Sequence, residues 1–135
     1  MSYERKEVYG IDEVLSKRLS PELEKGSETE VEFDGDRMYM NSLRYEVFDV
    51  KGTACCSCGV EGRYFAKERD KKAKRYHFNL YGVDDNGKEV MLTKARIVPK
   101  NNDVVDTVEN YQTMCRACHH KKAKPVSSSM EESKS

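Results

Sequence analysis

The stretch that decides the fold runs from Leu92 to Lys122 and reads LTKARIVPKNNDVVDTVENYQTMCRACHHKK. Close to its end two residues separate Cys115 from Cys118, and a matching pair, Cys55 and Cys58, lies upstream. Two Cys-x-x-Cys pairs are a usual ligand set of a structural zinc ion, because four thiolates complete a tetrahedral site. We therefore predict that these four cysteines bind one Zn²⁺, that the ion stabilises the fold, and that chelation of the metal unfolds residues 50–122.

A fifth cysteine, Cys56, lies inside the first pair. A tetrahedral site needs four ligands and the spacing favours Cys55 and Cys58, so Cys56 is expected to be a small core residue or a free thiol. Gly59 suits the positive φ that often follows the second ligand of such a turn. Redox-active cysteines are the alternative interpretation of the two pairs.

The composition explains why a metal is expected. Of the 135 residues, 37% are hydrophobic and 36% are charged, so the core must be small for the length. Such a domain often needs a metal or a disulfide. No apolar run approaches the ~20 residues of a membrane span, and the first ten residues are too charged for a signal peptide. The sequence thus predicts a cytoplasmic protein without a membrane partner, where paired cysteines more often bind metal than each other.

Charge is unevenly distributed although the net charge is zero. Residues 1–50 carry a net charge of −6, whereas residues 51–124, which contain the cysteines, carry +7. This asymmetry predicts a nucleic-acid-binding face on the metal core; the alternative is that the charges only solvate the surface. Within the basic run 67–75, the candidate phosphate contacts are Lys71, Lys72, Lys74 and Arg75.

The patterns predict an α+β protein in three parts. Residues 1–30 form an N-terminal helical segment, residues 31–124 form the zinc-binding domain, and residues 125–135 form a polar, disordered tail. In the first part the spacing of Val8, Ile11, Leu15 and Leu19 predicts an amphipathic helix over 4–19, used for packing or dimerisation.

The zinc-binding domain is predicted to mix short strands with two helices. A turn at 34–36 separates two strand-like pieces within 31–39, and Asn41 or Ser42 begins a helix that runs to Val50. Leu43, Val47 and Val50 line its buried face, and Gly52 suits the left-handed position after its end. The strands 76–83 and 88–98 flank a hairpin turn at 84–87, and a second helix covers about 113–122. A polar loop spans 100–106.

The block from about Arg44 to Lys122 resembles the HNH endonucleases of phages and bacteria, in particular their four-cysteine zinc-binding branch. Four pieces carry the resemblance: RYEVFDVKGTACCSCG, RYFAKE, HFNLYGVDDNGKEVMLTKARIVPK and DTVENYQTMCRACHHKKA. The resemblance implies a ββα-metal core that is stapled by the zinc and preceded by the N-terminal helices. If the chain is phage-encoded, it implies the cytoplasm of the bacterial host.

The family uses an Asp-His pair, an Asn that orients the catalytic His, and a helix residue that binds a divalent cation. Asn110 matches the family Asn, His119 matches the helix position, and Lys122 matches a basic residue near the helix end. The run Ile97-Val98-Pro99 fixes the register, which places Ala95 at the Asp and Arg96 at the His. Alanine offers no oxygen to a cation, and a guanidinium cannot act as a general base at neutral pH.

Three interpretations follow from this replacement. In the first, the protein binds nucleic acid, double-stranded DNA above all, through Arg96, Lys100 and Lys122 together with the basic run, but cuts poorly or not at all. In the second it is a working nuclease that uses Mg²⁺ or Mn²⁺ and takes His77, His119 or His120 as base. In the third it is an adaptor or inhibitor that binds a host protein through its acidic N-terminal half.

Overall fold

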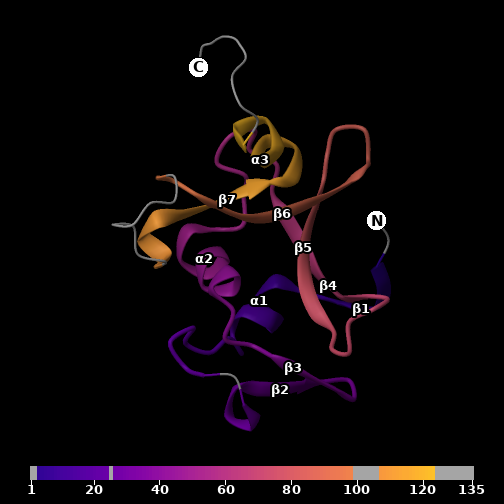
Figure 1. The fold of residues 1–135 in the computed structure, drawn as a ribbon. Helices are drawn as coiled ribbons and strands as arrows, with labels where there is room; N and C mark the ends of the chain where they lie inside the picture. Colours follow the sequence, from indigo (N-terminus) through magenta and orange to yellow (C-terminus); the bar gives the residue numbers. More distant parts are fainter. Residues whose placement is uncertain (1–2, 25, 99–106, 124–135) are drawn as a thin grey trace.

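The computed structural model describes residues 3–24, 26–98 and 107–123 and shows a mixed α+β protein built mainly of antiparallel strands (Figure 1). Five strands form the main sheet in the order β1-β4-β5-β6-β7. They are β1 (Tyr3–Tyr9), β4 (Gly62–Asp70), β5 (His77–Val83), β6 (Glu89–Arg96) and β7 (Tyr111–Cys115). The hairpin β2 (Glu30–Phe33) and β3 (Asp36–Tyr39) forms a second, two-stranded sheet. The α-helices are α1 (Ile11–Leu15), α2 (Leu43–Lys51) and α3 (Arg116–Ala123), and the 3₁₀ turns are η1 (Ser27–Thr29) and η2 (Val108–Asn110).

The N-terminal segment differs from the prediction. Only 11–15 of the predicted helix over 4–19 are α-helical, and the residues before them form β1, an edge strand of the main sheet. Cross-strand charge pairs explain the difference, because Arg5 lies opposite Glu68 and Glu4 opposite Arg69 in the β1–β4 register. The apolar spacing of three and four residues therefore corresponds to a helix only after Gly10. Strand β1 belongs to the same sheet as β4, β5, β6 and β7.

Helix α2 begins and ends as the sequence predicts. The Ser42 side chain accepts a hydrogen bond from the Arg44 amide, and Gly52 follows the helix with φ of 101°. Its buried face was predicted as Leu43, Val47 and Val50. The structure instead buries Tyr45, Val47 and Phe48 and leaves Val50 56% exposed. These rings pack into an aromatic core with Tyr9, Phe33, Phe65 and Phe78.

Strands β5 and β6 pair over only part of their length, from Leu80 with Leu92 to Val83 with Glu89. Before Leu80, side chains of α2 take over the bonding positions of β5. The Tyr45 hydroxyl accepts from the Phe78 amide at 3.0 Å, and the Arg44 guanidinium donates to the Phe78 carbonyl. The backbone of a half-paired strand is thus satisfied by a helix rather than by a neighbouring strand.

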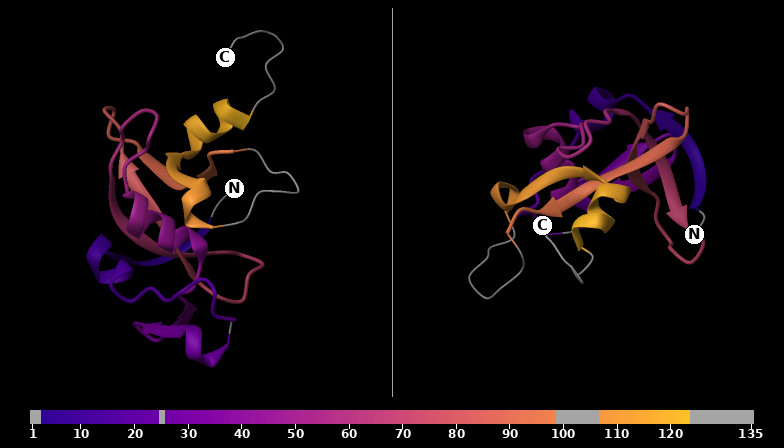
Figure 2. Two further views of the ribbon diagram at one scale, coloured as in Figure 1. Left: turned by 90° about the vertical axis from the view of Figure 1, so that its left-hand side faces the viewer. Right: turned by 90° about the horizontal axis from the view of Figure 1, so that it is seen from above.

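The C-terminal segment pairs with β6 along five residues, from Leu92 opposite Cys115 to Arg96 opposite Tyr111. The predicted helix over about 113–122 therefore begins later, at Arg116, because Thr113 to Cys115 still belong to β7. The predicted loop 100–106 and tail 125–135 lie outside the described residues. Figures 1 and 2 place α3 and the β2–β3 hairpin at opposite ends of the molecule. No helix among the described residues is long and apolar enough to cross a membrane.

Candidate metal centre and the surfaces beside it

The structure brings the four predicted ligands together. The sulfur atoms of Cys55, Cys58, Cys115 and Cys118 all lie within 4.8 Å of one another, and the Cys58 and Cys115 sulfurs are 3.8 Å apart. A Zn–S bond of about 2.3 Å in a tetrahedron gives sulfur–sulfur edges of about 3.8 Å. The cluster is therefore the right size to hold a metal ion, and thiolate ligands are those that zinc prefers.

The first cysteine pair lies in a tight turn between α2 and β4. The amides of Ser57 and Cys58 lie 3.4 and 3.5 Å from the Cys55 sulfur, and the Gly59 amide closes the turn onto the Cys55 carbonyl at 3.0 Å. Gly59 has φ of 83°, as the sequence indicates for the residue after the second ligand. This turn is a preformed sulfur cradle, because its amides point at the thiolate that would bind metal.

The second pair lies where β7 becomes α3: Cys115 ends the strand, and Cys118 is in the first turn of the helix. Two bonds from Thr113 join this segment to the first pair. Its carbonyl accepts from the Cys56 amide at 2.9 Å, and its hydroxyl donates to the Gly52 carbonyl at 2.5 Å. These two hydrogen bonds, one from the backbone and one from a side chain, thus hold the two pairs side by side.

The electrostatics of the thiols favour metal binding at Cys55. Burial raises the pKa of the Cys55 thiol, but backbone amides, those of Cys58, Cys115 and Ser57, outweigh it and bring this pKa down to about 6. Burial, together with the neighbouring thiols, raises the pKa of Cys115 to about 12. In the metal-free cluster the Cys55 thiolate is therefore stabilised, while the Cys115 thiol keeps its proton at neutral pH. A bound cation would stabilise all the thiolates, because its positive charge offsets the repulsion between neighbouring sulfur anions.

Cys56 points away from the cluster: it is exposed and does not belong to the group of four sulfurs. The prediction that it is a small core residue is therefore wrong, because its backbone amide, and not its side chain, faces β7. None of the five cysteines forms a disulfide.

Two residues at the expected remnant of the nuclease site lie at the end of β6. Ala95 is 1% exposed and lies opposite Gln112. Arg96 lies opposite Tyr111, with its guanidinium carbon 5.3 Å from the centre of that ring. The side chain at the expected base position thus rests on an aromatic ring of the neighbouring strand.

Asn110 and His119 take different places relative to that strand end. Asn110 continues the β6–β7 ladder, because its backbone oxygen accepts from the Ile97 amide at 2.8 Å and its Oδ1 from the Val98 amide at 3.1 Å. His119 lies on α3 and lines a hollow with Met91 and Thr93. The structure therefore brings Asn110 to the end of β6 with Arg96 and places His119 farther back along the strand.

The basic run 67–75 was predicted to contact phosphate, and its candidate residues have different surroundings in the structure. Lys71, Lys72 and Lys74 are exposed in the turn between β4 and β5. Arg75 instead pairs with Glu30 at 2.7 Å and donates to the Arg37 carbonyl at 3.1 Å. Of the other predicted contacts, Lys100 lies outside the described residues, and nothing is described of the Lys122 side chain.

A basic hollow that the sequence did not indicate lies between α3 and the sheet. Its volume is about 370 Å³, and its cationic and imidazole lining comes from Arg44, His77, Arg116, His119 and His120, with Asn79, Met91 and Thr93 between them. The lining contains no carboxylate. Burial lowers the pKa of His77, and the Arg44 charge lowers it further, so this imidazole is neutral at pH 7. Only the fold could bring these residues together, since they come from four elements, α2, β5, β6 and α3.

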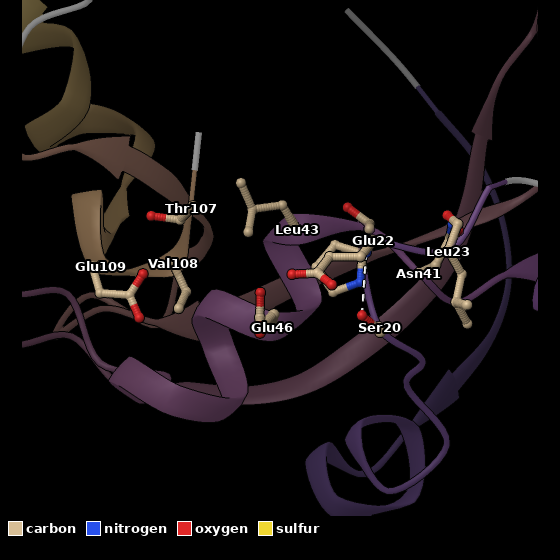
Figure 3. Close-up of a pocket in the computed structure, with 11 residues that line it drawn as sticks. Ser20, Glu22, Leu23, Asn41, Leu43, Glu46, Thr107, Val108 and Glu109 are labelled. Carbon is tan, nitrogen blue, oxygen red and sulfur yellow. Dashed lines mark hydrogen bonds between the residues drawn. The ribbon is translucent and has the colours of Figure 1, made fainter. Parts of the chain in front are cut away.

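An acidic hollow of about 560 Å³ lies by the start of α2 (Figure 3). In Figure 3, Glu46 lies on α2 between Glu109, on the side of η2, and Glu22, on the side of Ser20. The lining contains no cation. The two hollows give α2 one acidic and one basic side.

Comparison of this chain with protein families, with characterised proteins and with solved structures found no match. The HNH resemblance therefore remains a prediction from the residues quoted above.

Proposed function

We propose that this protein is a zinc-stabilised nucleic-acid-binding protein with an HNH-like core that has lost the groups needed for cutting. The four-sulfur cluster supports the structural zinc. The observation that carries the binding function is the basic hollow beside α3, whose lining has two arginines, three histidines and no acid. Nucleic-acid phosphates are recognised by such clusters of cationic and hydrogen-bonding side chains.

The basic hollow lies beside the metal centre, so metal binding and nucleic-acid binding are expected to be coupled. Arg116 and His119 directly follow the ligands Cys115 and Cys118 in sequence. A zinc ion bound by the four thiolates would fix the first turn of α3 and, with it, the position of both side chains against β6. The zinc would thus act on binding through the fold, without contact with the nucleic acid.

Salt-dependent binding is the first test. A labelled DNA of about 16 nucleotides, as a strand and as a duplex, is titrated by fluorescence anisotropy at several salt concentrations. We expect affinity to fall with salt and to fall about tenfold in Arg116→Glu. The matched control is Arg63→Glu, which changes an exposed arginine of β4 outside the basic hollow by the same charge. Absence of salt-dependent binding to both DNAs contradicts the proposal.

A nicking assay tests the loss of cutting. We expect no cleavage of plasmid with Mg²⁺ or Mn²⁺, because Ala95 offers no ligand and Arg96 remains protonated. Cleavage that His119→Ala abolishes would instead establish the working nuclease.

The acidic hollow supports a second candidate, an adaptor that binds a basic segment of a host protein. Glu22 and Glu46 come from the acidic N-terminal half, as this interpretation predicts. Binding of a host protein that is lost in Glu46→Gln, with no binding of nucleic acid, would favour the adaptor.

A further inference from the structure

A second hollow adjoins the basic one and shares two of its residues. Its volume is about 450 Å³, and it too has no acidic residue in its lining. Arg44 and His77 line both hollows. The second adds three tyrosines and two cations: Tyr39, Tyr45, Tyr76, Arg75 and Lys94. The two hollows, which we call the cationic groove, therefore run from α3 past the start of α2 to the β2–β3 hairpin.

Arg44 stands where the two hollows meet, and its guanidinium is fixed in place. One nitrogen donates to the Phe78 carbonyl, and another donates to the Asn79 side-chain oxygen at 3.0 Å. Both acceptors are neutral, and among the described residues Arg44 forms no ion pair. A half-buried, rigid cation that no carboxylate neutralises is suited to bind an anion that comes from outside the chain.

The far end of the groove offers flat surfaces. The Arg75 guanidinium lies 4.5 Å from the centre of the Tyr39 ring and is held there by Glu30. Tyrosine rings and guanidinium planes are the surfaces on which unpaired bases stack. Cations and planar groups thus line the same groove.

The size of the groove decides between the two forms of nucleic acid. Hollows of 370 and 450 Å³ have the volume of small-ligand pockets, about 300–1,000 Å³. They can receive single nucleotides. A duplex is read by an element that projects into its major groove, about 12 Å wide, whereas Arg44 is half-buried at the start of α2 and lines both hollows.

We propose that the cationic groove binds a single, extended nucleic-acid strand, with a phosphate on Arg44 and a base against Tyr39 and Arg75. The inference rests on the proposed function and narrows it from nucleic acid in general to unpaired strands. It replaces the duplex expected from the resemblance.

The test compares one sequence as a strand and as a duplex, with the metal-loaded full chain and anisotropy as the readout. We expect the strand to bind at least tenfold more tightly than the duplex. Arg44→Gln and Tyr39→Leu should each weaken strand binding about tenfold, and Arg63→Gln should leave it unchanged. Because Arg44 also supports β5, Lys94→Gln, which leaves those β5 bonds in place, is measured beside it, with circular dichroism on every variant.

Each outcome decides the matter. A duplex that binds as tightly as the strand overturns the inference and leaves the proposed function standing. Strand binding that is unchanged in the folded variants Tyr39→Leu and Lys94→Gln also overturns it, because the strand then binds elsewhere. If neither nucleic acid binds, the proposed function fails together with the inference.

Discussion

Removal of the metal should destabilise one end of this molecule far more than the other. The perturbation is chelation of the purified protein or the variant Cys118→Ser, which takes one ligand from the cluster. Structural zinc contributes about 10–16 kcal/mol at neutral pH, whereas a chain of 135 residues has a total stability of about 7–20 kcal/mol. The metal is therefore expected to supply a large part of the free energy of unfolding.

The structure indicates where the loss falls. Helix α3 has eight residues, fewer than the ~12–15 at which an isolated helix becomes marginally stable. Its position depends on Cys118 and on contacts with β6 and β7. The aromatic core of Tyr9, Phe33, Phe65 and Phe78 lies among β1, β2, β4 and β5, and its ring–ring contacts involve no cysteine. The sequence alone predicts unfolding of all of 50–122; the structure narrows this to the turn 53–62 and to 111–123.

Hydrogen exchange followed by mass spectrometry measures this difference. We expect chelation to remove protection from 53–62 and 111–123 first, while β4 and β5 keep most of theirs, and to lower the melting temperature. Cys118→Ser should behave like the chelated protein. The control is Cys56→Ser, which lies between two ligands yet outside the cluster and should keep its zinc and its melting temperature. Complete loss of metal with an unchanged exchange pattern would refute this reasoning.

Two further predictions concern the support of the metal turn and of the hairpin. Gly82→Ala should cost about 3 kcal/mol and weaken zinc retention, because an added Cβ would lie 2.3 Å from the Glu61 carbonyl oxygen, whereas Gly10→Ala has nothing within 4 Å and serves as control in the same melts. Lys67→Met should make the free energy of unfolding depend less steeply on pH in acid. Hydrogen bonds from Lys67, and then from Lys6, lower the Asp36 pKa below its ordinary 3.8. The stability that the Asp36 carboxylate contributes is therefore complete above about pH 3.8 and is lost as pH falls through its lower pKa in the folded protein. Equal slopes of unfolding free energy below about pH 4 in both proteins would contradict that role.

Part of this structure follows from local signals in the sequence. Ser42 and Gly52 mark the ends of α2, and the turn at 84–87 marks the β5–β6 hairpin, because caps and tight turns need particular residues. The four-cysteine cluster is equally predictable from the sequence, because the spacing within each pair and the number of ligands that a metal needs identify it.

The rest depends on partners distant in sequence. Residues 3–9 form a strand because Glu68 and Arg69 lie opposite them, and no local pattern carries that information. Arg75 of the basic run likewise forms an ion pair with Glu30, which is distant in sequence, and no local pattern predicts this pair. Arg44 lies in a helix start and gives no local signal of binding. The position proposed to bind phosphate follows only from the tertiary structure. Strands β5 and β6 do not pair before Leu80, and Arg44 of α2 therefore donates to the Phe78 carbonyl.

The two halves of the cationic groove have different structural supports, and this leads to a last prediction. Arg44 is held by the backbone and side chains of β5, so its position does not depend on the metal. Arg116 is held by α3, which we expect to lose its structure without zinc. Chelation should therefore weaken strand binding without abolishing it, and Arg116→Gln should have almost no effect on the affinity of the metal-free protein. Arg44→Gln should still reduce that affinity. If chelation removes all binding while circular dichroism shows that the sheet persists, the metal end carries the whole site, and the role given to Arg44 is wrong.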